Sequence, residues 1–288
     1  MIGLLDADIL TYKCGFSSQR TSYRFVYHNG TKVEFPDMTL NEIKKYLVGE
    51  KVSASMGNLQ QLIRPEPVEF AYQRVKLLVD SILDNTKSDS YKMFLTADDK
   101  SNFRFKLATI KEYKGNRKNM KRPIHYNAIR DYLQGHYDAI MIYDQEADDA
   151  MGIEQMKALD HSIICSIDKD LDMIPGYHYN IDTQELYTAT DPGSLFLDDN
   201  RRKVHGRGLK WFYAQMLLGD NVDNIPGAAG YGPVKVMEAL EDKNTEAGMI
   251  DIVKGIYARQ YGSDYMKAFN EIGNLLWIRR YEEEVKFK

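Results

Sequence analysis

The chain has 288 residues, enough to bury a full hydrophobic core, and 43% of them are hydrophobic and 28% charged. This composition indicates an ordinary globular protein, and no apolar run approaches the roughly 20 residues that a membrane span requires. The net charge of −4 does not exclude a nucleic-acid partner, because removing nine acids gathered in one site leaves the remainder at +5.

No signal peptide is readable at the start of the sequence, where Asp6 follows a short apolar run that no basic segment precedes. We therefore expect a cytoplasmic protein. The two cysteines, Cys14 and Cys165, form no disulfide framework and are expected to be buried thiols.

The first predicted element is a buried strand at residues 2–5, which leads into Asp6-Ala7-Asp8. A carboxylate just past the end of a strand lies where open α/β sheets place their ligands. Residues 22–35 predict a β-hairpin, because Asn29-Gly30 tolerates the positive φ of a tight turn. Residues 39–64 are weakly patterned and predict no function.

A long helix is predicted at residues 67–83, followed by a strand at 91–95 and two further acids, Asp98 and Asp99. Residues 100–122 then hold nine cations and one acid, with three aromatic residues among them. This imbalance favours contact with a polyanion, and aromatics among cations suit stacking on unpaired bases. The alternative is a solvated basic face. Pro123 opens the next predicted helix, which ends near Gly135.

The run at residues 139–143 predicts a buried strand, and the acids of Glu146-Ala147-Asp148-Asp149 follow it at a helix start. Unpaired N–H groups and the helix dipole favour negative charge there, so an acid-capped helix is the plain alternative to a site. A fourth strand at 161–167 is followed at once by Asp168-Lys169-Asp170.

Short hairpins are predicted at 177–187 and 195–204. A compact apolar helix is predicted at 211–218, and Asp220 and Asp223 follow it. In the following turn, Gly230-Tyr231-Gly232, backbone N–H groups open to an anion could act with Lys235, although tight turns need glycine in any case. Residues 245–281 predict two amphipathic helices that serve packing.

Eight acids from four segments are candidates for one site: Asp6, Glu146, Asp148, Asp149, Asp168, Asp170, Asp220 and Asp223. If they converge, their mutual repulsion requires cations, and all-oxygen ligation favours Mg²⁺ or Mn²⁺ over Zn²⁺. Two such ions can promote an in-line phosphoryl displacement. The acids therefore predict phosphoester hydrolysis, and the basic stretch predicts a nucleic-acid substrate.

Five motifs, in order, resemble the flap endonuclease and 5′–3′ exonuclease family, including stand-alone phage enzymes and the 5′-nuclease domain of bacterial DNA polymerase I. They are Leu4-Leu5-Asp6, residues 112–117, residues 146–149, Asp168-Lys169-Asp170 and residues 219–236. The resemblance implies a metal-dependent nuclease of replication or repair, located in the host cytoplasm if phage-encoded. It would act on DNA with 5′ flaps, 5′ ends or single-strand/duplex junctions.

The resemblance also implies roles for individual residues. One metal ion would lie among Asp6, Glu146, Asp148 and Asp149, and the second among Asp168, Asp170, Asp220 and Asp223. The helical-arch residues Tyr113, Lys114 and Arg117 would be catalytic, with Lys114 stabilising transition-state charge. DNA-binding positions would be Arg104, Lys111, Lys118, Gly230, Gly232 and Lys235, in part within a helix-turn-helix whose turn holds a monovalent cation such as K⁺.

The sequence departs from the family at Asp98, since relatives carry this acid in a Phe-Asp-Gly context that is absent here. Residues 15–90 match no family motif. Asp8 and Asp172 are candidates either for supporting positions or for solvated acids.

The predicted fold is α/β, a central, mostly parallel sheet with flanking helices. We expect an α/β core at residues 1–205, with the basic arch at about 100–122, and a helical region at 206–288 with its duplex-binding motif at about 217–240. We expect the protein to be a monomer that interacts with replication proteins. Alternatives are a ribonuclease H that removes RNA primers from RNA–DNA hybrids, a junction-binding protein without catalysis, and a haloacid-dehalogenase-like phosphatase with an aspartyl nucleophile.

Overall fold

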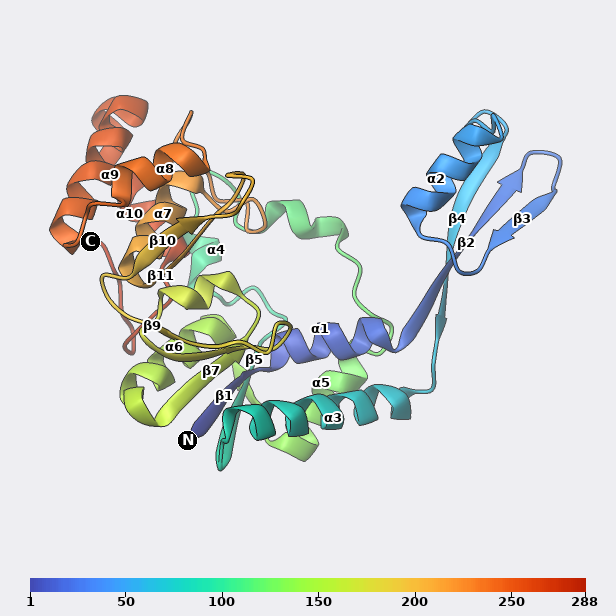
Figure 1. Ribbon diagram of the computed structural model, residues 1–288, viewed down its shortest axis with the longest axis horizontal. Helices are drawn as coiled ribbons and strands as arrows, with labels where there is room; N and C mark the ends of the chain where they lie inside the picture. The colour runs from blue at the N-terminus through green and yellow to red at the C-terminus, as the bar shows by residue number, and fades with distance from the viewer. The chain divides into compact units, whose positions relative to one another are not determined.

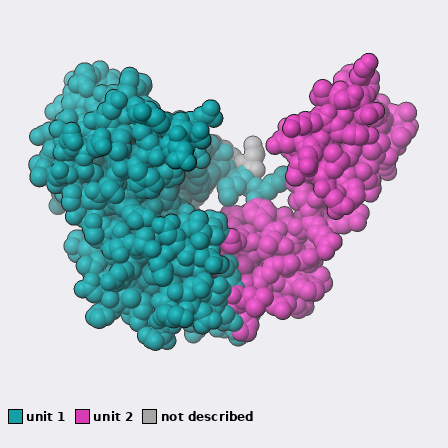
Figure 2. Space-filling view, viewed as in Figure 1, with its two compact units in different colours: residues 1–9, 78–121, 130–288 teal, residues 10–77, 122–129 magenta. Residues whose placement is uncertain are grey.

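The computed structural model describes residues 1–288, apart from the side chains of Lys118 and Asn119. It divides into two compact units, which Figure 2 colours separately. The first comprises residues 1–9, 78–121 and 130–288, and the second comprises residues 10–77 and 122–129. The boundary that we predict near residue 205 remains a prediction, and the helices that follow it lie in the first unit together with the central sheet.

The first unit is built on a six-stranded sheet, in the order β6-β5-β1-β7-β8-β9. Its strands are β1 (Ile2–Asp6), β5 (Ser90–Thr96), β6 (Ile140–Ile142), β7 (Ser162–Ser166), β8 (Gly176–Asn180) and β9 (Leu186–Ala189). All neighbouring pairs are parallel except β8 and β9, which are antiparallel. This confirms the predicted mostly parallel sheet, and the buried, nearly continuous apolar character of β7 suits its central place.

The helices of this unit are more numerous than the sequence predicts. They are α3 (Val68–Thr86) and α5 (Tyr126–Tyr137), both shared with the second unit, and α4 (Phe103–Leu107), α6 (Ala147–Lys157), α7 (Gly208–Leu218), α8 (Pro233–Leu240), α9 (Glu246–Tyr261) and α10 (Tyr265–Leu276). Short 3₁₀ helices are η1 (Gly115–Asn119), η2 (Leu159–His161), η3 (Lys169–Met173) and η4 (Gly262–Asp264). A small two-stranded sheet pairs β10 (Ser194–Leu197) with β11 (Val204–Arg207), as predicted.

The main core lies around α7, whose residues Phe212, Tyr213, Met216 and Leu217 are fully buried. Side chains of α9 and α10 belong to the same apolar cluster. Within the described residues, no helix is both long and apolar enough to cross a membrane.

The second unit contains a three-stranded antiparallel sheet in the order β3-β2-β4, with β2 at Gln19–Tyr27, β3 at Lys32–Phe35 and β4 at Gly57–Pro65. Helix α2 (Leu40–Gly49) packs on one face of it, as Figure 1 shows. The predicted hairpin is confirmed by β2 and β3. The sequence did not predict β4, α2, or helix α1 (Ala7–Ser17), which begins directly after β1.

Candidate functional site

The candidate site lies at the carboxyl ends of the parallel strands of the first unit. Asp6 is the last residue of β1, Glu146 precedes α6 after β6, and Asp168 follows β7. Asp6 is only 3% exposed, and its carboxylate accepts hydrogen bonds from Ile9 N at 3.0 Å and Ser166 Oγ at 2.7 Å. Ser166 Oγ also accepts from Asp168 N at 3.0 Å, which ties β1 to the β7 loop.

Mutual repulsion marks several of these acids as one group. Burial, together with the neighbouring Asp8 and Asp168, raises the pKa of Asp6 to about 7. The pKa of Asp148 is raised well above its ordinary value by burial and by the charges of Asp168, Asp6 and Glu146. These carboxylates therefore lie close enough to oppose one another's ionisation, as the sequence predicts.

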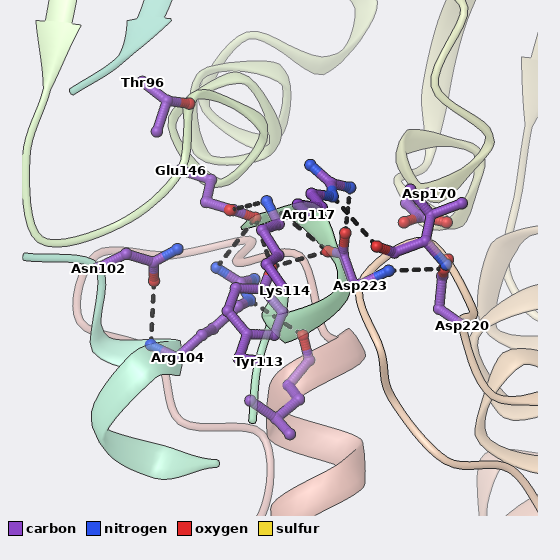
Figure 3. Close-up of polar contacts among 12 residues, drawn as sticks. Thr96, Asn102, Arg104, Tyr113, Lys114, Arg117, Glu146, Asp170, Asp220 and Asp223 are labelled. Atoms are coloured by element: carbon purple, nitrogen blue, oxygen red, sulfur yellow. Dashed lines mark hydrogen bonds and ion pairs between the residues drawn. The ribbon is translucent and has the colours of Figure 1, made fainter. Parts of the chain in front are cut away.

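Glu146 behaves in the opposite way. Its own burial would raise its pKa, but the charges of Lys114 and Arg104 outweigh burial and lower the pKa to about 2. The Lys114 ammonium pairs with Glu146, and Tyr113 OH donates to the same carboxylate at 3.0 Å. Glu146 is thus ionised, and basic residues from a different segment neutralise it, as Figure 3 shows.

The basic segment reaches the acids through Tyr113, Lys114 and Arg117. Tyr113 OH lies 2.8 Å from Asp223, so its single proton is shared between Glu146 and Asp223, and Arg117 pairs with the Asp223 carboxylate. Lys114 Nζ lies 3.7 Å from Asp223. The backbone of Lys114 is left-handed, with a φ of 54°. A positive φ at a non-glycine residue stores strain, which is common at functional positions. All three residues predicted as catalytic, Tyr113, Lys114 and Arg117, therefore contact Glu146 or Asp223.

A second group of acids is held by η3, α7 and the loop after α7. Lys169 Nζ bridges Asp170 at 3.0 Å and Asp220 at 2.9 Å. Gln215 donates to Asp170, and Trp211 Nε1 donates to Lys169 O at 2.7 Å, so α7 positions η3. Burial and the charge of Asp168 raise the pKa of Asp170 to about 6.

The loop after α7 turns back on itself. Asp220 and Ile225 form an isolated antiparallel bridge. Asp220 Oδ1 also accepts from Val222 N at 2.6 Å and Asp223 N at 3.1 Å. Gly219 permits this turn, because its φ is +71° and a Cβ there would lie 2.4 Å from Gly227 N. The loop thereby presents Asp223 to the basic segment and Asp220 to Lys169 of η3.

Asp149 has a different environment from the other acids. It is 0% exposed, and Arg104, 1% exposed, pairs with both of its oxygens. Glu146 N and Arg279 N also donate to them, each at 3.0 Å. Arg104 donates further to Leu275 O and Trp277 O. We therefore correct the assignment of Arg104 to DNA: in this structure it is a buried counterion. A metal ion could bind Asp149 only by replacing these donors.

The remaining predicted positions differ in their surroundings. Asp98 and Lys111 are exposed. Lys235 is exposed beside the Tyr231 ring, in a helix that begins at Pro233 after Gly232 as predicted. Gly230 has a φ of +76°. The side chain of Lys118 lies outside the described part of the chain.

Two supporting cations escaped prediction from the sequence. Arg130 holds Asp8 at 2.8 Å and donates to Thr96 O, while Thr96 Oγ1 accepts from Ala147 N at 2.9 Å. These contacts join the ends of β1 and β5 to the start of α6. Lys169 stands between two acids in the sequence, and this placement is the signal that could have identified it as their counterion.

The donors available for a metal ion are carboxylates, which suits Mg²⁺ or Mn²⁺. Burial, and then mutual repulsion, raise their pKa values, and a divalent ion would relieve the repulsion. Across the described residues, no group of three or more acid, histidine or cysteine side chains is arranged closely enough to hold a metal ion. The lysines and arginines described above occupy several of the carboxylates. The chemistry of the donors therefore fits a divalent ion, whereas their arrangement here is that of ion pairs.

No protein-family model matches the sequence, and no curated protein is similar to it in sequence. Solved structures are similar in fold. A crystal structure of the bacteriophage T5 D15 protein co-crystallized with metal ions has a TM-score of 0.53 at 16% identity, and the match covers 94% of this chain and 87% of that chain. A second structure shows a variant of the bacteriophage T5 D15 flap endonuclease in a pseudo-enzyme–product complex with DNA and metal ions. Its TM-score is 0.50 at 17% identity, with the same coverage. The chain therefore shares the fold of this flap endonuclease, which confirms the predicted resemblance at the level of the fold.

Proposed function

We propose that the chain is a structure-dependent 5′ nuclease, a flap endonuclease or 5′–3′ exonuclease that hydrolyses DNA phosphodiesters in replication or repair with divalent metal ions. The proposal rests on one observation, which is the contact between the acidic group at the sheet edge and the basic stretch at residues 100–122. Glu146, which follows β6, contacts Tyr113 and Lys114 of the basic stretch, and Asp6 and Asp168 from the ends of β1 and β7 act electrostatically on Asp148 of the same acidic group. The T5 flap endonuclease, which shares the fold, was crystallized with DNA and metal ions.

In this proposal Asp6, Glu146 and Asp148 would hold one ion, and Asp168, Asp170, Asp220 and Asp223 the second. Bound there, divalent ions would supply Lewis-acid stabilisation of charge on the phosphoryl group. Asp149 would act indirectly, since its carboxylate accepts from Glu146 N and so orients the start of α6. The expectation that Asp149 ligates a metal is therefore replaced by a positioning role.

The chain's own cations would place the scissile phosphate. Lys114 and Arg117 now pair with Glu146 and Asp223, and an incoming phosphate offers them a competing anionic partner. A cation held by a strained backbone is already oriented when the substrate arrives, and such preorganisation is the main source of electrostatic catalysis. Lys235 and the turn before α8 would contact the duplex backbone.

The test uses a 5′-labelled flap substrate with Mg²⁺. We expect short labelled products, their loss with EDTA, and an Asp148→Asn variant that binds DNA but does not cleave it. Asp148 is the better choice than Asp149, because the buried ion pair makes Asp149 variants prone to unfolding. The exposed Asp160 supplies the control, and Asp160→Asn should cleave normally.

Unchanged cleavage by Asp148→Asn would contradict the metal assignment. The same assay run with an RNA–DNA hybrid separates the ribonuclease H alternative, since faster cleavage of the hybrid than of the DNA flap would favour removal of RNA primers.

A further inference from the structure

The three-stranded sheet of the second unit has one covered face and one open face. On the covered face Phe25 and Phe35 pack with the fully buried Ile43 of α2. Side chains alternate along each strand, so the intervening residues point to the opposite face. The pairing register therefore settles which residues share the open face.

The open face is strongly biased towards positive charge. Its residues are Arg20, Ser22, Arg24 and Val26 from β2, Lys32 and Glu34 from β3, and Asn58, Gln60, Leu62 and Arg64 from β4. Four of these are cations and one is an acid. Two of the cations, Arg20 of β2 and Arg64 of β4, lie directly opposite each other on neighbouring strands.

A pair of like charges directly across an antiparallel ladder destabilises the sheet. Little in the described part of the chain offsets it. Glu66 lies 3.7 Å from Arg20, whose side chain is 84% exposed, and exposed ion pairs of this kind contribute little. Arg24 lies 3.9 Å from Glu34 and donates to Gln60 at 3.1 Å. An external anion would relieve the repulsion between Arg20 and Arg64.

The dimensions and composition of the face indicate which anion. Six residue steps along β2 span roughly 20 Å, and three strands span roughly 10 Å, which corresponds to about half a turn of duplex DNA. None of the ten residues on this face is aromatic, so it lacks the stacking platform with which proteins hold unpaired bases. Arginine, lysine, serine and amide side chains are the groups that contact phosphate and sugar.

We propose that this face, defined by Arg20, Arg24, Lys32 and Arg64, binds the phosphodiester backbone of duplex DNA without reading its sequence. The proposal rests on the proposed function, since it supplies an additional contact to the same substrate. It gives a role to a segment, residues 19–65, that carries none of the motifs of the nuclease site. The contact anchors the duplex and takes no part in the chemistry.

The test compares the salt dependence of DNA binding in the full chain. Each phosphate contact contributes about −0.9 to the slope of log affinity against log salt concentration. Arg20→Gln/Arg64→Gln should therefore make this negative slope shallower by about 2. The loss of affinity for duplex DNA between 50 and 200 mM salt should then shrink about tenfold. Arg20→Lys/Arg64→Lys keeps the charges and should retain the slope.

The matched control is Lys44→Gln/Lys45→Gln, which removes two exposed charges from α2 on the covered side of the same sheet. Its slope should equal that of the native chain. Binding is measured on a blunt duplex and on a single strand, with EDTA present to prevent cleavage, and urea unfolding verifies that each variant is folded.

Equal slopes for Arg20→Gln/Arg64→Gln and the native chain on the duplex would overturn the inference, while flap cleavage by the native chain would leave the proposed function standing. A change confined to the single strand would overturn the assignment to duplex. If the native chain neither binds nor cleaves DNA, the proposed function fails and this inference fails with it.

Discussion

The four hydrogen bonds to the Asp149 carboxylate leave neither oxygen without a protein donor. Arg104, its counterion, is equally buried and also donates to two carbonyl groups at the C-terminal end of α10, those of Leu275 and Trp277. Breaking a buried pair by removing one charge leaves the other charge uncompensated in a low-dielectric interior. The pair therefore joins the start of α6 to the C-terminal segment.

We expect Asp149→Asn to lower the free energy of unfolding by about 3–5 kcal/mol, because Arg104 would remain buried without a full counterion. Urea denaturation measures the change. Asp160→Asn removes an exposed carboxylate and should change the free energy of unfolding by less than about 0.5 kcal/mol. Equal stability of the two variants would show that the Arg104 pair does not support the fold.

Lys114 is the residue whose loss should separate catalysis from binding. Its ammonium meets the acids directly, so Lys114→Ala should reduce turnover on the order of 10²–10³-fold, with a smaller effect on affinity. Single-turnover cleavage and equilibrium binding of a flap substrate give the two quantities. Lys111→Ala, at an exposed position, should weaken binding alone. A loss of affinity alone for Lys114→Ala would make Lys114 a simple phosphate anchor.

At the scale of elements, the β8 strand carries a buried histidine that links sheet stability to pH. His178 Nε2 hydrogen-bonds with Ile174 O at 2.8 Å, and the His178 ring stacks on Tyr187 of β9 at 5.2 Å. Burial, assisted by the charge of Arg207, lowers the pKa of His178 from 6.5 to about 4. The folded state thus keeps His178 neutral where the unfolded chain would protonate it.

Because its folded pKa is depressed, His178 contributes stability above pH 6.5 that is lost as the pH falls towards about 4. His178→Phe preserves a ring against Tyr187 but cannot titrate. We expect the native chain to exceed this variant in unfolding free energy at pH 7.5. The difference should narrow by up to about 1.4 kcal/mol per pH unit below pH 6.5. Acids common to both proteins cancel in this comparison, and a difference independent of pH would contradict the assignment.

Across the whole first unit, the burial of the carboxylates at the sheet edge and their mutual repulsion oppose folding, as the raised pKa values of Asp6 and Asp170 indicate. A divalent ion that binds the folded state and not the unfolded chain would stabilise it. At a concentration 100 times its dissociation constant, the ion should add about 2.7 kcal/mol.

We therefore expect Mg²⁺ to raise the Tm of the native chain above that found in NaCl of equal ionic strength. Asp168→Asn/Asp170→Asn should lose most of this increase, since both residues belong to the proposed second ion site. Differential scanning calorimetry measures each case. An identical Tm in the two salts would contradict the proposed metal site.

Much of the candidate site was predictable because its signals are local. A carboxylate that follows a buried apolar run is legible in the sequence, and parallel strands bring such residues to one edge. That reasoning located Asp6, Asp148 and Asp168, the acids after a predicted apolar helix added Asp220, and the motif resemblance gave Lys114 its role. The polar partners of these residues, such as Arg130 and Lys169, were not predicted, since they depend on which side chains meet after folding.

The sequence by itself determined where the main strands lie along the chain and which acids follow them, because periodicity and turn residues act over a few positions. Only the tertiary structure decided that Asp149 serves a buried ion pair with Arg104, 45 residues away. It likewise decided that β4 pairs with β2, which brings Arg64 to the same face as the three cations of β2 and β3. Desolvation and long-range pairing exist only once distant segments are packed together, so no local pattern can specify them.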